Sequence, residues 1–247
     1  MIVCGETESK VPMATDPPAL ERVRFRSLAH LASQNLREAV ISGHLRAGDR
    51  IREQQLAKTL GISQQTVREG LRELEYEGFV RKIPNKGTYV TQLTHDDIQQ
   101  ISEVRVVLEV LAVGRAAERL HPEAAERLRE ILEKIRISVE ADDRLEFHRR
   151  DLEFHAVIWE LSDNEHLGSA LRRLASSLFA FVLFQQDRPT FDDAYRQHRQ
   201  ILEALLTGDR RTAQSGYLKA TRAFWRKHHR VRLPSERHLL FSGGTAQ

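Results

Sequence analysis

Residues 53–90 constrain the fold of this chain more than any other segment. Their pattern predicts two short helices, 54–60 and 64–77, joined by a tight turn, and then two strands, 79–83 and 88–91, around a basic tip. A helix, a turn, a second helix and a two-stranded wing make a winged helix-turn-helix, whose second helix enters the major groove of DNA. The segment therefore indicates a protein that reads double-stranded DNA.

The charge of the chain is spread unevenly along its length. Its 247 residues include 38 Lys or Arg and 35 Asp or Glu, so the net charge is only +3. Between Leu20 and Thr91, however, thirteen cations stand against eight anions, which is a net charge of +5. A basic N-terminal third beside a slightly acidic remainder favours a polyanionic partner for that third.

Cysteine usage and hydropathy indicate the compartment. Cys4 is the only cysteine, which excludes an intrachain disulfide and favours a reducing environment. No apolar run reaches the length of about 20 residues that a membrane span needs. We therefore expect a cytoplasmic protein without a membrane partner.

After Thr91 the periodicity becomes entirely helical. The predicted fold class is mainly α, an N-terminal winged helix-turn-helix followed by a C-terminal all-α antiparallel helical bundle. Beside the two short helices, the predicted helices cover 28–42, 94–120, 122–139, 142–161, 165–186, 191–206 and 209–231. The expected organisation is a disordered tail at 1–26, a DNA-binding domain at 27–92, an effector-binding and dimerisation domain at 93–231 and a flexible tail at 232–247.

The second short helix has two different sides. Val67, Leu71 and Leu74 fall on one side of a helical wheel, while glutamines and arginines occupy the other. Arg68 suits a bidentate pair with guanine, and either Gln64 or Gln65 suits adenine. The residues predicted to contact DNA are Gln64, Gln65, Thr66, Arg68 and Arg72 of this helix, Lys82, Asn85, Lys86 and Gly87 of the wing, and Arg37.

An alternative for the two arginines needs no DNA. Arg68 and Arg72 would then be solvated and paired with glutamates of their own helix, such as Glu69, Glu73 or Glu75. The order of helix, turn, helix and basic wing favours DNA binding for the segment as a whole.

A group of metal-ligating residue types lies in the helical region. Asp151 and His155 are four residues apart and share one face of a helix, and His198 lies on a later helix. Aspartate and histidine side chains bind zinc, nickel or manganese. On spacing alone, a surface pair or a helical hydrogen bond explains Asp151 and His155 as well as a metal does.

Residues 35–90 resemble the N-terminal domain of the GntR family of bacterial transcription regulators. The resemblance rests on LREAVISG, LGIS, VREGLREL and the wing tip PNKG, in the family's order and spacing. The rest of the chain resembles the FadR-type branch, whose C-terminal helical domain, FCD, binds effectors. The resemblance implies a homodimeric repressor of a palindromic operator, controlled by a small organic or sugar acid.

The chain departs from that family at the start of the recognition helix. Where the family commonly has Ser-Arg-Thr-Pro, this chain has Ser63-Gln64-Gln65-Thr66, while Arg68 is retained. We therefore expect a half-site that keeps the guanine read by Arg68 and favours adenine opposite Gln64.

The resemblance also bears on the helical domain. It implies metal ligation by Asp151 and His155 within DLEFH and by His198, but Ala220 stands where the family has a fourth ligand, histidine. Three alternatives remain: water or effector completes the shell, His148 substitutes for the missing ligand, or the site binds effector without metal. The residues expected at the effector are Arg105, His148 and Tyr217, although Arg105 would equally pair with Glu109 four residues on.

Two functions of other classes compete with regulation. A metal-dependent hydrolase carrying a winged-helix module needs a nucleophile and a base beside an open metal position, and the sequence shows no such motif. A winged helix can also bind protein instead of DNA, but the basic wing argues against this. We expect no catalytic residues.

Overall fold

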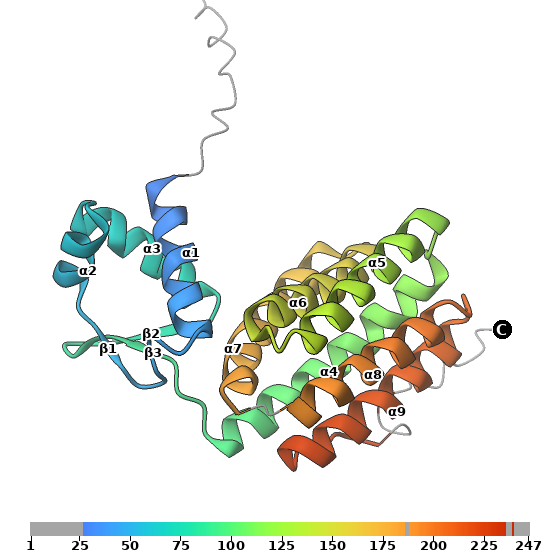
Figure 1. Cartoon of the computed structure of the whole chain (residues 1–247). Helices are drawn as coiled ribbons and strands as arrows, with labels where there is room; N and C mark the ends of the chain where they lie inside the picture. The colour runs from blue at the N-terminus through green and yellow to red at the C-terminus, as the bar shows by residue number, and fades with distance from the viewer. Residues whose placement is uncertain (1–26, 186–187, 236–238, 240–247) are drawn as a thin grey trace, which may run out of the picture.

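The computed structural model describes residues 27–185, 188–235 and 239. The predicted tail at 1–26 and most of the one at 232–247 lie outside these residues. As predicted, the chain is mainly α and consists of a winged helix-turn-helix followed by a bundle of helices (Figure 1).

The N-terminal domain contains three helices and a three-stranded sheet. They are α1 (Leu28–Ile41), β1 (Arg50–Ile51), α2 (Glu53–Leu60), α3 (Gln64–Tyr76), β2 (Val80–Ile83) and β3 (Gly87–Val90). The sheet is antiparallel in the order β1-β3-β2, with Arg50 opposite Tyr89 and Lys82 opposite Thr88. The predicted two-stranded wing was therefore incomplete. Two residues are too few for a periodic signal, and neighbouring Gly48 and Asp49 indicate a turn.

Local signals mark the end of α2 and the start of α3, and apolar spacing fixes how α3 packs. The Ser63 hydroxyl accepts a hydrogen bond from the amide of Thr66 at 3.0 Å, and Gly61 adopts a left-handed conformation with φ of 66° after α2. Val67, Leu71 and Leu74 are buried against the core. Gly70 lies where α3 comes closest to α1, because a Cβ there would be 2.7 Å from the carbonyl oxygen of Ala29.

The wing turns tightly at its basic tip. The amide of Lys86 donates to the carbonyl of Ile83 at 3.0 Å. Asn85 and Gly87 both have positive φ, 60° and 111°, which asparagine and glycine tolerate best. The turn therefore presents the side chains around Lys86 to solvent.

The C-terminal domain is a bundle of helices, and its described buried apolar residues form a main cluster and a smaller one around Trp159. Its helices are α4 (His95–Glu118), α5 (Pro122–Glu140), α6 (Arg144–Leu161), α7 (Glu165–Gln185), α8 (Arg188–Leu205) and α9 (Arg210–His229). Thr94 and Asp97 form the predicted capping box of α4, which packs against α6, α7, α8 and α9. Within the described residues, no helix combines the length and the apolar run that a membrane crossing requires.

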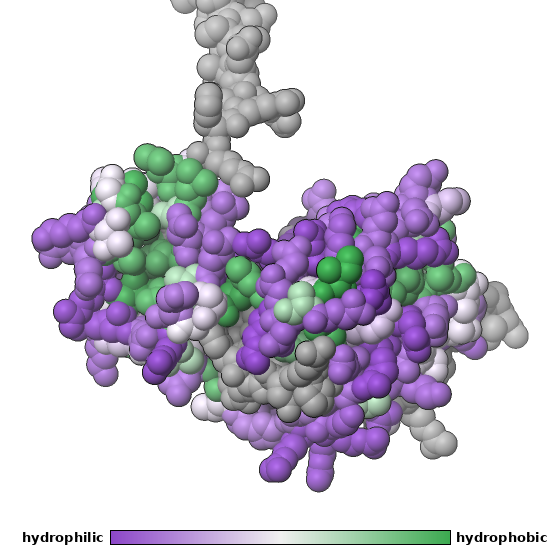
Figure 2. Space-filling model, in the orientation of Figure 1, coloured by the Kyte–Doolittle hydropathy of each residue, from purple (hydrophilic) through white to green (hydrophobic). Residues whose placement is uncertain are grey.

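The two domains lie side by side. A short connection after β3 leads into α4, and α1 faces α7 across the junction (Figure 1). The space-filling surface is hollowed between the two domains (Figure 2).

Candidate functional site

The polar edge of α3 faces away from the protein core. Gln64, Gln65, Arg68 and Arg72 are all exposed, while the apolar side of the same helix is buried. The edge of α3 that is predicted to read bases is therefore exposed to solvent and does not pack into the protein core. Thr66 is only half-buried, and its hydroxyl lies 2.8 Å from that of Ser63 within the helix cap.

One carboxylate, from Glu53, organises this edge. The Nε of Arg68 donates to Glu53 Oε2 at 2.6 Å, and the side-chain amide of Gln64 donates to the same oxygen at 3.2 Å. Burial tends to raise the pKa of Glu53, but the hydrogen bonds from Arg68 and Gln64 lower it below its usual value. The carboxylate is thus held ionised beside both predicted base readers.

This contact differs from the alternative expected from the sequence. Arg68 pairs with a glutamate of α2, fifteen residues earlier, and not with a glutamate of α3. Sequence reasoning missed Glu53 because spacing within one helix cannot reveal a partner on another. Gln65 does bond within α3, to Glu69 at 3.1 Å.

The predicted DNA-contacting residues of the wing lie at its surface. Lys82, Asn85 and Lys86 are exposed, and Gly87 is half-buried at the end of the turn. The backbone of Lys82 is fixed by a bond from its amide to Glu75 of α3 at 3.1 Å. This bond ties the wing to the helix whose edge it flanks.

Arg37 lies on α1 and lines the hollow between the domains. Its guanidinium donates hydrogen bonds to both carboxylate oxygens of Glu77, with the shortest distance 2.7 Å. Its contact with DNA stays a prediction.

The structure brings the three predicted metal ligands together inside the helical domain. Asp151 and His155 come from α6 and His198 comes from α8, and one ligand atom from each lies within 4.8 Å of the others. All three side chains are buried. A buried cluster of one carboxylate and two imidazoles has the composition of a transition-metal site.

The orientation of His198 tests whether this cluster fits a cation. Its Nδ1 lies 2.7 Å from the carbonyl oxygen of Ala194, so this nitrogen donates. In the neutral ring Nε2 is then an acceptor, yet it lies 2.6 Å from Asp151 Oδ1. Two acceptors this close require a proton between them, because two ligands of one metal ion lie about 3 Å or more apart. The donor set fits a metal, and binding would require His198 and Asp151 to separate by a few tenths of an ångström.

Charges around the cluster shift its titration. Burial raises the pKa of Asp151, but the neighbouring His198 and His155 lower it overall. Burial also lowers the pKa of His155 well below its usual value, and Arg105 adds to this effect. The neutral imidazole and ionised carboxylate favoured in this way are the forms that ligate metals.

Glu109 borders the cluster and was not predicted to belong to it. Its Oε1 lies 3.8 Å from His155 Nδ1 and accepts from Arg105 at 3.0 Å, while its Oε2 accepts from the indole of Trp159 at 3.0 Å. Glu109 is completely buried. The pair with Arg105 anticipated from spacing therefore exists, but it is buried beside the metal ligands instead of lying on the surface.

The three predicted effector residues do not share one cavity. Arg105 and Tyr217 line a small internal cavity of about 10 Å³, which is room for about one water molecule. The Ser102 hydroxyl in its wall has no hydrogen-bond partner among the described residues. His148 instead lines the much larger hollow toward the winged domain, and it is absent from the metal cluster. Ala220 is buried on α9.

Comparison with known proteins identifies both domains. A model of bacterial regulatory proteins of the gntR family matches residues 28–90, and an FCD domain model matches residues 100–219. The chain is 31% identical over 189 residues to the probable D-xylose utilization operon transcriptional repressor of Paenarthrobacter nicotinovorans, covering 74% of this chain and 83% of that one. The chain belongs to the GntR family.

Further relatives agree with the assignment of this chain to the GntR family. The chain is 27% identical over 181 residues to the gluconate operon transcriptional repressor of Bacillus subtilis, covering 71% of this chain and 74% of the relative. The fold matches E. coli McbR/YncC with a TM-score of 0.70 at 22% identity, over 83% of this chain and 99% of that one. The GntR-family regulator is thus a transcription regulator and not an enzyme, which excludes the hydrolase alternative.

Proposed function

We propose that this GntR-family regulator is a homodimeric repressor that reads a palindromic operator with the α3 edge. The observation that carries the proposal is the exposed pair of Gln64 and Arg68, both held by Glu53. The bond to Glu53 uses Nε of Arg68, and the side chain is 50% exposed, so its Nη nitrogens are proposed to bind the acceptors of guanine. The exposed wing supplies Lys82 and Lys86 for phosphates.

The proposed control site is the helical domain. Asp151, His155 and His198 would hold a divalent ion, zinc, nickel or manganese. Such an ion, bound by three protein ligands, offers open coordination positions to the oxygens of a small carboxylate effector. One related repressor is named for gluconate, a sugar acid, which supports this effector class.

The cavity beside Arg105 and Tyr217 would have to enlarge to hold an effector. At about 10 Å³ it is too small for an organic acid, so an effector that binds there would separate α4 from α9. Arg105 would then have to exchange its bond with Glu109 for the ligand. Since a ligand acts only through different affinities for two arrangements, this rearrangement supplies a physical basis for coupling to the DNA-reading domain.

A selection from random duplex DNA tests the proposed function. We expect the full chain to enrich a two-fold symmetric site with guanine opposite Arg68 and adenine opposite Gln64 in each half. Binding should weaken steeply with salt, because phosphate contacts release counterions. A pool that shows no symmetry, or no base preference opposite Gln64, would contradict the proposal.

Homodimer formation is proposed to use α4. Val104, Val107 and Leu111 follow helical spacing on this helix, and their exposed fractions are 53%, 42% and 39%. Exposed apolar side chains that line one helix face favour burial against a second copy.

We expect Val104→Asp to convert the dimer to monomer, because it places a charge within that face. Sedimentation velocity measures the mass. Ile137→Asp on α5 is a matched control, since Ile137 is 52% exposed, and this variant should stay dimeric. A dimer that persists with Val104→Asp would place the interface elsewhere.

A further inference from the structure

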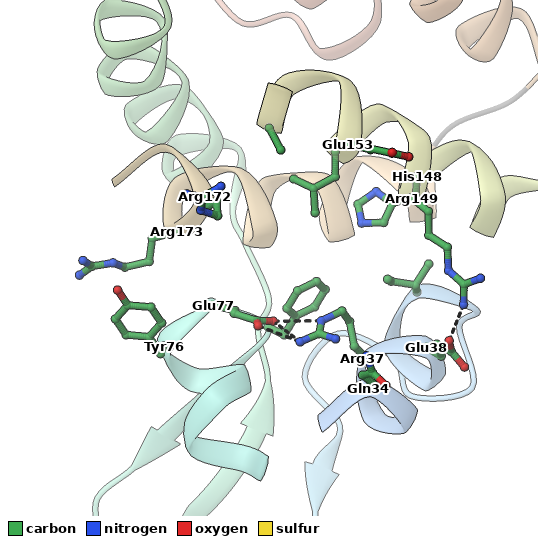
Figure 3. A pocket seen from close by; sticks show the side chains of 14 residues that line it. Gln34, Arg37, Glu38, Tyr76, Glu77, His148, Arg149, Glu153, Arg172 and Arg173 are labelled. Atoms are coloured by element: carbon green, nitrogen blue, oxygen red, sulfur yellow. Dashed lines mark hydrogen bonds and ion pairs between the residues drawn. The ribbon is translucent and has the colours of Figure 1, made fainter. Parts of the chain in front are cut away.

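A cavity of about 740 Å³ lies between the winged domain and the helical domain. Residues of α1 and α3 form one wall, and residues of α6 and α7 form the other (Figure 3). Its volume falls within the range of small-molecule sites, about 300–1,000 Å³. None of Asp151, His155 and His198 lines it, so it is separate from the candidate metal cluster.

The walls of this interdomain cavity combine an apolar surface with arginines. Ile41 and Phe79 contribute apolar surface from the winged domain, and Leu152 and Ala156 contribute it from α6. The cavity is also lined by four arginines, Arg37, Arg149, Arg172 and Arg173, and by three glutamates, Glu38, Glu77 and Glu153.

Each of the three glutamates already has a guanidinium partner. Glu77 accepts from Arg37, and Glu38 pairs with Arg149 across the domain junction (Figure 3). Glu153 pairs with Arg150 at 2.7 Å. Arg150 is not part of the lining. Arg150 is also paired with Glu146. The lining itself holds four arginines against three glutamates, so its net charge is positive.

Arg173 is the cation best placed to receive an anion. Its guanidinium carbon lies 4.8 Å from the ring centroid of Tyr76, and within the described parts of the chain it joins no ion pair. Arg172 precedes it on the same helix, and both are exposed. Figure 3 shows the guanidinium of Arg173 beside Tyr76 at one end of the cavity. An arginine held by a ring at the edge of an apolar cavity suits a carboxylate attached to an apolar body.

The direct contacts between the domains at this cavity are few and exposed. Arg149 and Glu38 are 48% and 49% exposed in their ion pair, and such pairs contribute little in water. A ligand that touched both walls would therefore add a substantial part of the contact that orients the winged domain.

We propose that this interdomain cavity binds a small organic anion with an apolar body, and that the bound anion fixes the winged domain against the helical domain. The carboxylate binds at Arg173, and the body packs on Leu152 and Ala156. Binding needs neither metal nor DNA. The effect of the ligand on operator affinity rests on the proposed function, whereas the binding itself does not.

Calorimetry of the full chain with 2-naphthoate, in the presence of a chelator, tests the site. We expect 2-naphthoate to bind and its uncharged amide to bind at least about tenfold more weakly, a difference of about 1.4 kcal/mol. Arg173→Gln should lower the naphthoate affinity to that of the amide. Ala156→Trp, which fills the cavity, should abolish binding of both.

Arg129→Gln is the matched control, since Arg129 is 48% exposed on α5 in an ion pair with Glu126 and lies outside the cavity. It should bind like the unmodified chain. No binding of naphthoate to the unmodified chain, or binding that both cavity variants retain, overturns the site. If naphthoate binds as expected but leaves operator affinity unchanged in a chain that binds its operator, the fixing of the winged domain is overturned and the proposed function stands.

Discussion

Arg68→Ala is expected to remove most of the operator affinity of this regulator. A bidentate contact with guanine contributes about 1–3 kcal/mol of discrimination, and a dimer loses two such contacts. The expected loss is therefore at least about 30-fold in Kd, corresponding to about 2 kcal/mol. Fluorescence anisotropy with the selected operator, and with a duplex altered at the guanine, measures both affinity and discrimination.

If Arg68 reads the guanine, the same anisotropy measurement should also show a change in base discrimination. The unmodified chain should lose affinity when the guanine is replaced, but Arg68→Ala should bind both duplexes equally. Arg127→Ala serves as a control, because Arg127 is 52% exposed in an ion pair with Glu160 in the helical domain. If Arg68→Ala still distinguished the two duplexes, Arg68 would not be the reader of that base.

The variant Glu53→Gln tests whether Glu53 orients Arg68 without itself contacting DNA. The change removes the negative charge that holds Arg68 and Gln64 but retains a side chain of similar shape. Discrimination at the guanine should fall, because the guanidinium loses its fixed orientation, whereas binding to unrelated duplex should rise, because a negative charge near phosphates is removed. An Arg68→Ala variant cannot show this opposite pair of effects.

Divalent metal is expected to stabilise the helical domain strongly. Zinc, nickel or manganese at about 100 times its Kd should add about 2.7 kcal/mol to the free energy of unfolding, because the ligands converge only in the folded state. For a chain of this size that corresponds to a rise in Tm of roughly 5–10 °C. Differential scanning calorimetry of the chelated and reloaded protein gives the shift.

Variants at the cluster identify the ligands. Asp151→Asn and His198→Ala should each lose the rise in Tm that metal produces, whatever their own stability without metal. His166→Ala, which alters an exposed histidine, should keep it. Ala220→His should tighten metal binding by restoring the fourth ligand that the family resemblance implies. No rise in Tm with any of the three metals would argue for a proton shared by Asp151 and His198.

Much of the architecture follows from local signals in the sequence. Ser63 and Gly61 set the ends of the two short helices, and Thr94 opens α4 as expected. Strand β1 escaped prediction because its pairing with β3 joins residues nearly forty positions apart. The start of α8 was placed at 191, three residues late, although the helix begins at Arg188 before a proline.

The candidate sites were predictable to the extent that one helix carries them. The exposed edge of α3 and the shared face of Asp151 and His155 follow from helical spacing. Contacts between separate helices or strands cannot be predicted from this spacing. Three contacts depend on how separate helices pack, and none of them follows from spacing within one helix. They join Glu53 to Arg68, Glu109 to His155, and Arg37 to Glu77.

Strand β1 connects the wing to the helices that precede and follow it in the chain. It stands in the chain between α1 and α2, yet its backbone is bonded to β3 behind the wing tip. We expect a push on the wing tip to reach α1 through the sheet, and α1 carries Glu38 at the interdomain junction. The wing also contacts α3 through the amide of Lys82 and Glu75, so strain at the tip has two routes into the rest of the domain.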